Sequence, residues 1–172
     1  MIPETINENT LNKLVSKMHE KNRKACLLMY YAGLRVSEVC KLKKRDIDLK
    51  SGTIFISRSK NLKNRYVLID DKLIPHLLEL MKGKKDDDVL IKTKPALLWF
   101  NIKYQSKKYG IRVHPHTLRH SYATNLLNDG FPITDVKELL GHSDVSTTQV
   151  YLHTSLTHIK DRWNTLKGGK KP

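Results

Sequence analysis

The sequence is poor in cysteine and has no long apolar run, and each shortage excludes a class of protein. Two cysteines in 172 residues, Cys26 and Cys40, do not suit a disulfide-rich secreted domain, and both lie among apolar neighbours. We therefore expect free, buried thiols in a reducing compartment. No stretch approaches the roughly 18 apolar residues that a membrane span needs, and residues 1–4 do not resemble a signal peptide. A cytoplasmic protein without a membrane partner is predicted.

Acidic residues are also scarce beside the basic ones. The chain has 32 Lys and Arg against 17 Asp and Glu, a formal net charge of +15. Such a charge is not needed for folding and indicates a polyanionic partner, nucleic acid first. The tail at 167–172 holds only a few of these charges, and the others are spread from Lys13 to Lys160. A merely soluble basic protein is the alternative.

The spacing of apolar residues predicts one mainly helical domain. With 39% hydrophobic residues, a chain of this length can bury one sizeable core. In the helix that Pro95 begins, Trp99 and Phe100 are expected to be core residues rather than base-stacking groups. The first predicted helix begins at Asn9 or Thr10, and the second ends at Gly33. Further helices are predicted at about 35–42, 71–82, 95 onward, 114–128, 132–141 and 155–166.

Between the third and fourth helices the apolar period changes to that of strands. Residues 46–49 and 65–69 alternate, 53–57 are rich in β-branched side chains, and a polar turn covers 60–64. This pattern predicts three short antiparallel strands. The fold class is therefore mainly α with a small three-stranded antiparallel β-sheet.

Chemically capable side chains gather in the last third of the chain. His116 and His120 share one helix face, as zinc ligands do, but Thr117 stands where a zinc protease needs its glutamate. No third ligand follows at ordinary spacing, so we expect no metal. Helix caps, surface charges and core rings are the structural alternatives for each of these residues taken singly.

Phosphoryl transfer fits the same segment better. The guanidinium of Arg119 matches phosphate oxygens and stays charged at any working pH. Histidines such as His116 and His142 move protons near pH 7. The hydroxyl of Tyr151 can attack phosphorus and hold it covalently. With a second arginine, these groups make a sufficient metal-free set.

Four motifs in one order give the chain its resemblance to a known family. Arg119 lies three positions after His116, His142 lies 23 positions after Arg119, and Tyr151 lies nine positions after His142. The chain resembles the tyrosine recombinases, the phage integrase and Xer group, from about residue 4 to 165. The motifs are YAGLRVSEV (31–39), HTLRHSYAT (116–124), LLGHS (139–143) and TTQVY (147–151).

The resemblance implies a role for each matching residue. Arg35 and Arg119 grip the scissile phosphate and stabilise its pentavalent transition state. His142 hydrogen-bonds the same phosphate, and His116 serves in proton transfer. Tyr151 is the nucleophile, which forms a 3′-phosphotyrosyl link and releases a 5′-hydroxyl. Neither ATP, metal nor another cofactor is implied.

The resemblance also implies a lysine as general acid for the leaving 5′-oxygen. The family pattern G-K-G-x-K-x-R aligns with SKNLKNR at 59–65, which places Lys60 at the catalytic position. Ser59 and Asn61 replace the two turn glycines, so the turn can differ and Lys63 is the alternative.

Taken together, the resemblance predicts a site-specific recombinase or integrase with the DNA breaking-rejoining fold. We expect a single catalytic domain at 1–172, with a core at about 4–166 and a basic tail at 167–172. The separate N-terminal core-binding domain of the family is expected to be absent. A catalytically silent DNA-binding relative, a type IB topoisomerase-like enzyme and a structural RNA-associated protein are the alternatives.

The implied partners are double-stranded DNA and further copies of the chain. Recombination in this family needs four protomers on two DNA sites, and protomers usually dock a C-terminal helix into a neighbour. The amphipathic helix at 155–166 either makes that contact or packs on its own core. Both alternatives stay open.

Overall fold

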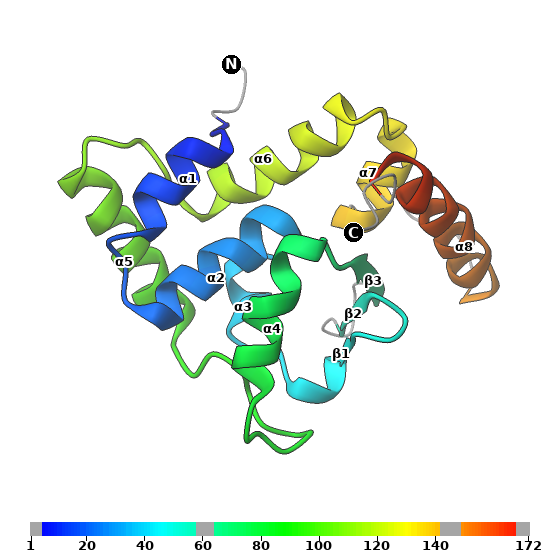
Figure 1. The fold of residues 1–172 in the computed structure, drawn as a ribbon, viewed down its shortest axis with the longest axis horizontal. Coiled ribbons are helices and arrows are strands. Elements are labelled where there is room, and N and C mark those ends of the chain that lie inside the picture. The colour runs from blue at the N-terminus through cyan, green and yellow to red at the C-terminus, as the bar shows by residue number, and fades with distance from the viewer. Residues whose placement is uncertain (1–4, 58–63, 142–148, 168–172) are drawn as a thin grey trace.

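The computed structural model describes residues 5–57, 64–141 and 149–167, and only the backbone of 149–157. A helical part occupies one side of the molecule, and the small sheet with two further helices occupies the other (Figure 1). The predicted fold class is confirmed. The described helices are α1 (Glu8–Val15), α2 (Glu20–Tyr31), α3 (Val36–Val39), α4 (Ile74–Met81), α5 (Pro95–Lys108), α6 (Pro115–Asn128), α7 (Ile133–Leu140) and α8 (Gln149–Leu166), with 3-10 turns η1 (Lys44–Asp46) and η2 (Asp71–Leu73).

Helix α2 is the centre of the helical part. Residues 24–30 of this helix are all buried, which suits a helix that other helices surround. It contacts α1, α3, α5 and α6. Cys26 is buried in α2 and Cys40 is half-buried after α3, and both are free thiols as predicted. None of the described helices has the length and apolar composition that a bilayer crossing requires.

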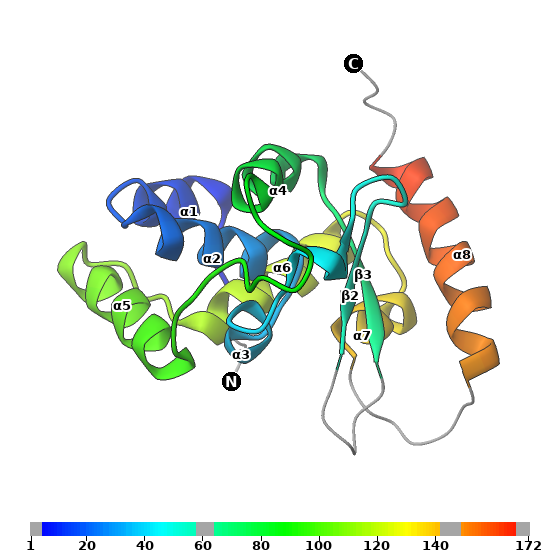
Figure 2. The ribbon, with the colours of Figure 1, turned by 90° about the horizontal axis from the view of Figure 1, so that it is seen from below.

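The sheet lies beside this helical part. Its strands β1 (Ile47–Asp48), β2 (Thr53–Ile56) and β3 (Arg65–Leu68) are antiparallel in the order β1-β2-β3. Ile54 pairs with Val67, and both are fully buried in the main core. Helices α7 and α8 contact β3, and Figure 2 shows them beside the sheet, away from α1 and α5.

The C-terminal helix α8 packs on its own chain. Ile159 is only 2% exposed and joins a second apolar cluster formed by β3, α6 and α7. The ring of Trp163 lies 5.6 Å from that of Phe131, and Arg162 pairs with Asp135 at 3.0 Å. The described side chains of α8 therefore favour packing on the chain's own core.

The predicted start of this helix at 155 is wrong. Helix α8 begins at Gln149, so Tyr151 lies within its first turn rather than on a segment before it. The polar residues Thr154 and Ser155 resemble a helix start, but neither glycine nor proline interrupts residues 149–166. Threonine and serine lower helix propensity only slightly, so the helix continues through these two positions.

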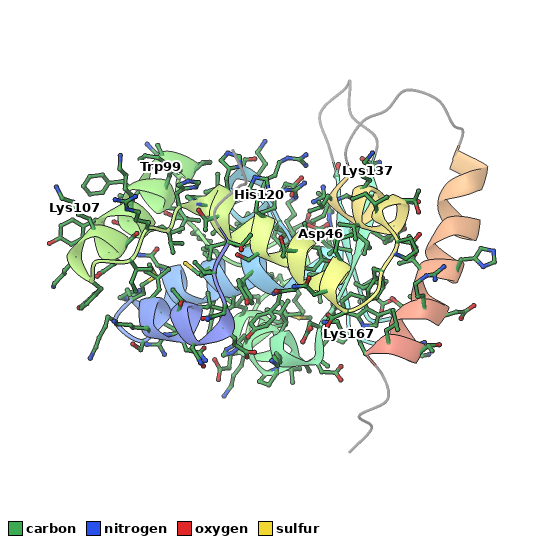
Figure 3. All side chains as sticks on the ribbon, turned by 90° about the horizontal axis from the view of Figure 1, so that it is seen from above. Asp46, Trp99, Lys107, His120, Lys137 and Lys167 are labelled. Carbon is green, nitrogen blue, oxygen red and sulfur yellow. The ribbon has the colours of Figure 1, made fainter. Side chains whose placement is uncertain are left out.

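The prediction that Trp99 and Phe100 belong to the core is also wrong. Trp99 is 39% exposed and Phe100 is 59% exposed. Helix α5 buries one narrow face, Leu98, Ile102 and Ser106, and the two aromatic residues directly after Leu98 point away from it. Figure 3 shows Trp99 at the edge of the molecule.

The turn after α2 brings two functional segments close together. Gly33 has φ +62°, and a Cβ at this position would overlap the ring of Tyr122 on α6. Glycine is therefore required here for its conformation and for its small size. This close approach packs the turn between α2 and α3 against α6.

One buried ion pair joins the sheet to the helical part. Arg65, at the start of β3, is 4% exposed and donates from Nη1 and Nη2 to the two carboxylate oxygens of Glu38 at 2.7 and 2.8 Å. Burial by itself would raise the pKa of Glu38, but the hydrogen bonds and charge of Arg65, with hydrogen bonds from Arg35, lower that pKa to about 2. The pair is therefore charged at neutral pH.

Replacing Gly33 with alanine should destabilise the fold strongly. The new Cβ combines a left-handed backbone with overlap on Tyr122, so we expect a loss of about 2–4 kcal/mol in the free energy of unfolding. Gly52→Ala is the matched control, because Gly52 has φ +67° but no atom near its Cβ, and about 1 kcal/mol should be lost there. Urea unfolding measures both. Equal losses would contradict the close packing at Gly33.

Stability should depend on Glu38 in acid. The carboxyl has a pKa of about 2 in the folded protein and about 4.3 when unfolded. Its stabilisation is therefore complete above the unfolded value and is lost as the pH falls toward 2, by at most about 3 kcal/mol. The difference in unfolding free energy between wild type and Glu38→Gln should shrink by that order between pH 6 and pH 2.

The control for this measurement is Glu79→Gln. Like Glu38, Glu79 is in an ion pair, in its case with Lys24, but its side chain is 63% exposed. This variant should therefore keep most of the wild-type pH dependence. A difference between wild type and Glu38→Gln that stays constant with pH would refute the assignment.

Candidate active site

Arg35 stands where the chain turns from α2 into α3. Its backbone N–H donates to Oε2 of Glu38 at 2.7 Å, and its Nη1 donates to Oε1 at 2.9 Å. One carboxylate thus caps the short helix and holds the arginine side chain. The Arg35 side chain is still 35% exposed, so it is fixed and accessible at once.

Arg119 lies on α6 and is only 8% exposed. Its Nη1 donates to the carbonyl of Gly33, and its Nη2 donates to the carbonyl of Leu140 at 2.6 Å. The guanidinium is therefore held between the end of α2 and the end of α7. The alternative that Arg119 is a surface charge is wrong.

The two arginines meet at one hollow of about 250 Å³. His116, Pro115 and Trp99 also line it. Two cations beside a partly enclosed space create a positive potential that favours an anion. Guanidinium groups match the oxygens of a phosphate in particular, so the hollow has the chemistry of a phosphate site.

A second, more open hollow of about 460 Å³ adjoins the first at Arg35. Lys41, Lys43 and Arg45 contribute its basic lining, along η1 and β2. Lys43 and Arg45 also contact Asp87, at 3.1 and 2.7 Å. Basic side chains therefore continue from the phosphate site along the surface, as a strand with several phosphates would require.

The histidines near the hollow differ in their roles. His116 is exposed at its rim. The helix cap is His114, whose Nδ1 accepts from the backbone N–H of Thr117 at 3.3 Å, so the capping alternative for His116 is wrong. Burial, and then the charges of His116 and Arg119, lower the pKa of His120. At a given pH, His120 is therefore less protonated than an ordinary histidine.

The described residues hold no group of three His, Cys, Asp or Glu side chains that could bind a metal ion. This statement covers His116 and His120, the pair with metal-ligand spacing.

Several predicted site residues cannot be placed against this hollow. Lys60, its alternative Lys63 and His142 lie outside the described residues. The backbone of Tyr151 belongs to α8, and its side chain lies outside the described set. The structure thus brings Arg35, Arg119 and His116 together, and the catalytic roles of all seven residues stay predictions.

The structure does describe the chain directly before His142. Helix α7 ends at Gly141, whose φ is +64°. The carbonyl of Leu139 accepts from Nε of Arg65 at 2.8 Å, and that of Leu140 accepts from Arg119. Two arginine side chains therefore fix the end of α7.

Sequence reasoning assigned no role to Glu38 and Arg65, which hold this site together. Both lie inside recognised motifs, Glu38 in YAGLRVSEV and Arg65 at the end of SKNLKNR. The available signal was a charged residue inside an otherwise apolar helix or strand pattern, since such a residue needs a buried partner.

Comparison with known proteins identifies relatives. The sequence profile of the phage integrase family matches residues 4–158. The tyrosine recombinase XerA of Thermococcus onnurineus (strain NA1) is 35% identical over 172 residues, which cover 92% of this chain and 61% of that protein. The chain therefore spans less than two thirds of this curated relative.

Solved structures show the same fold. A crystal structure of XerA recombinase superposes with a TM-score of 0.70 at 28% identity, covering 94% of this chain and 65% of that one. The XerH site-specific recombinase bound to difH substrate, in a pre-cleavage complex, gives 0.65 at 25% identity, covering 98% and 53%. The chain belongs to the phage integrase family, as a relative of the Xer tyrosine recombinases.

Proposed function

We propose that this chain is the catalytic domain of a tyrosine-type site-specific DNA recombinase. One observation carries the proposal: the fold brings Arg35 and Arg119, which are far apart in the sequence, to the same hollow, with His116 at its rim. Two guanidinium groups match the anionic oxygens of a phosphodiester, and a histidine can move a proton near pH 7.

The two arginines bind the scissile phosphate and stabilise the charge that develops on its oxygens. Both are held before the substrate arrives, Arg35 by Glu38 and Arg119 by the carbonyls of Gly33 and Leu140. Donors that are already in place need no reorganisation during the reaction, which lowers the barrier. His142, next after Gly141, donates a further hydrogen bond to the phosphate.

Tyr151 attacks the phosphorus atom of that phosphate. The bond from the tyrosine oxygen to phosphorus forms as the bond to the 5′-oxygen breaks. His116 takes the phenolic proton, and Lys60, or Lys63 in its place, supplies a proton to the 5′-oxygen. A 5′-hydroxyl of another strand reverses these steps and reseals the DNA. The phosphotyrosyl bond keeps the energy of the phosphodiester, so neither ATP nor metal takes part.

Double-stranded DNA is the proposed substrate. The net charge of +15 and the basic lining of the second hollow support it, and the related XerH structure holds a DNA substrate. We place the activity in the cytoplasm, where free thiols such as Cys26 stay reduced.

Strand exchange on two sites also requires four protomers in this proposal. The helix at 155–166 remains the proposed contact between them, although Ile159 and Trp163 pack on the chain's own cluster in this structure. A contact that used their apolar faces would have to replace that packing.

Wild-type protein should form a covalent adduct with DNA through Tyr151. A pool of nicked duplexes with random sequence traps the adduct, because the short piece that carries the released 5′-hydroxyl diffuses away and cannot reseal the strand. Sequencing the trapped DNA gives the target site. Tyr151→Phe should abolish the adduct. Tyr104→Phe, at an exposed tyrosine away from the hollow, should leave it unchanged, as should EDTA.

The other functions give different results in these assays. A silent DNA-binding relative would bind with strong salt dependence, form no adduct and leave supercoiled plasmid intact. A topoisomerase-like enzyme would form the adduct on most sequences and relax plasmid without joining two sites. An adduct that survives Tyr151→Phe would contradict the proposed nucleophile.

A further inference from the structure

Arg65 closes the motif SKNLKNR but takes no part in the chemistry described above. We propose that Arg65 is a positioning residue for strand cleavage, which fixes Arg35 and the end of α7 relative to each other through one buried guanidinium. This inference rests on the proposed function of the hollow. Arg65 itself does not line either hollow, so it acts through its neighbours.

All three nitrogens of the Arg65 guanidinium make hydrogen bonds. Nη1 and Nη2 donate to the carboxylate of Glu38, and Nε donates to the carbonyl of Leu139. The guanidinium is planar and rigid, so these two acceptors take fixed places around it. With only 4% of the side chain exposed, water has little access to compete for these bonds.

The carboxylate of Glu38 passes this constraint to Arg35. Its Oε1 accepts from Nη1 of Arg65 at 2.7 Å and from Nη1 of Arg35 at 2.9 Å. Its Oε2 accepts from Nη2 of Arg65 at 2.8 Å and from the backbone N–H of Arg35 at 2.7 Å. Each carboxylate oxygen is therefore shared, and a rotation of Glu38 displaces the Arg35 side chain.

The carbonyl of Leu139 passes the constraint to the other side of the hollow. The next carbonyl, that of Leu140, accepts from Nη2 of Arg119. A shift in the last turn of α7 therefore moves the carbonyl that accepts from Arg119, and it also moves Gly141. Arg65 is thus connected to Arg35 through Glu38 and to Arg119 through the end of α7. A contact that only stabilised the fold would not need to reach both of these arginines.

The test replaces Arg65 with lysine, which keeps the charge but cannot donate three bonds from one rigid plane. Arg23→Lys is the matched control. Arg23 also donates from Nε and Nη2, in its case to the carbonyls of Val15 and Met18, and it lines neither hollow. Adduct formation is followed under single-turnover conditions on one nicked duplex that the wild type cuts. Thermal unfolding shows that each variant is folded at the assay temperature.

We expect Arg65→Lys to slow adduct formation at saturating protein by about 10- to 100-fold, the effect of a small misplacement of catalytic groups. The protein concentration for half-maximal DNA binding should stay within about threefold of wild type. Slower cleavage with unchanged binding would show a defect in the reaction rather than in binding. Arg23→Lys should match the wild type in both. A cleavage rate of Arg65→Lys within about threefold of wild type would overturn the proposal.

A double-mutant cycle with Arg35→Lys separates positioning from general loss of structure. If Arg65 acts through Arg35, the double variant should be at least about fivefold faster than the product of the two single effects predicts. Effects that multiply within that limit would overturn the proposed connection, because they are expected of two independent defects.

Should Arg65→Lys fail to fold, Arg65→Met combined with Glu38→Gln serves instead. It removes the charges of Arg65 and Glu38 together, so no buried charge is left unpaired, while Arg35, which is 35% exposed, loses its carboxylate partner. The same slow cleavage with unchanged binding is expected. Wild-type cleavage by this folded variant would overturn the positioning role. Absence of an adduct with wild-type protein would instead contradict the proposed function, so the two failures are distinguishable.

Discussion

The carboxylate of Glu38, buried between Arg35 and Arg65, is the contact on which the rest of the site depends. It accepts four hydrogen bonds from these two arginines and keeps its charge because they lower its pKa to about 2. Loss of one partner from a buried ion pair typically costs about 3–5 kcal/mol, since the other charge is left unpaired. A small domain is stable by only about 5–15 kcal/mol. Folding and assembly of the site are therefore closely linked.

Local structure followed from the sequence wherever local pattern decides it. The apolar spacing of α1 and α4 and the β-branched residues of β2 predicted those elements, because burial of one face or alternate faces leaves a period. The pattern failed where burial was incomplete. Helix α5 carries aromatic residues on two sides and buries only one narrow face, so composition alone could not show that Trp99 and Phe100 are exposed.

The chemistry of the site was predictable from motif order, but its architecture was not. Arg35, His116 and Arg119 were named from their motifs, and the structure brings them to one hollow. The partner of Glu38 lies 27 residues away on a strand, and no periodicity records which buried charge meets which. The same holds for Arg119, whose acceptors are backbone carbonyls and so leave no trace in the sequence.

Arg119 and Arg35 have different partners at the hollow, and this difference sets the total charge of the site. Two nitrogens of Arg119 donate to neutral carbonyls, and the guanidinium stays protonated at neutral pH. Arg35 shares one carboxylate with Arg65, so these three groups together carry a single positive charge. The cluster thus has a charge of about +2, whereas a phosphodiester carries about one negative charge and the pentavalent state formed by phenolate attack carries about two. In the proposed reaction, this charge suits the transition state better than the bound substrate, which is the condition for accelerating a reaction rather than merely binding DNA.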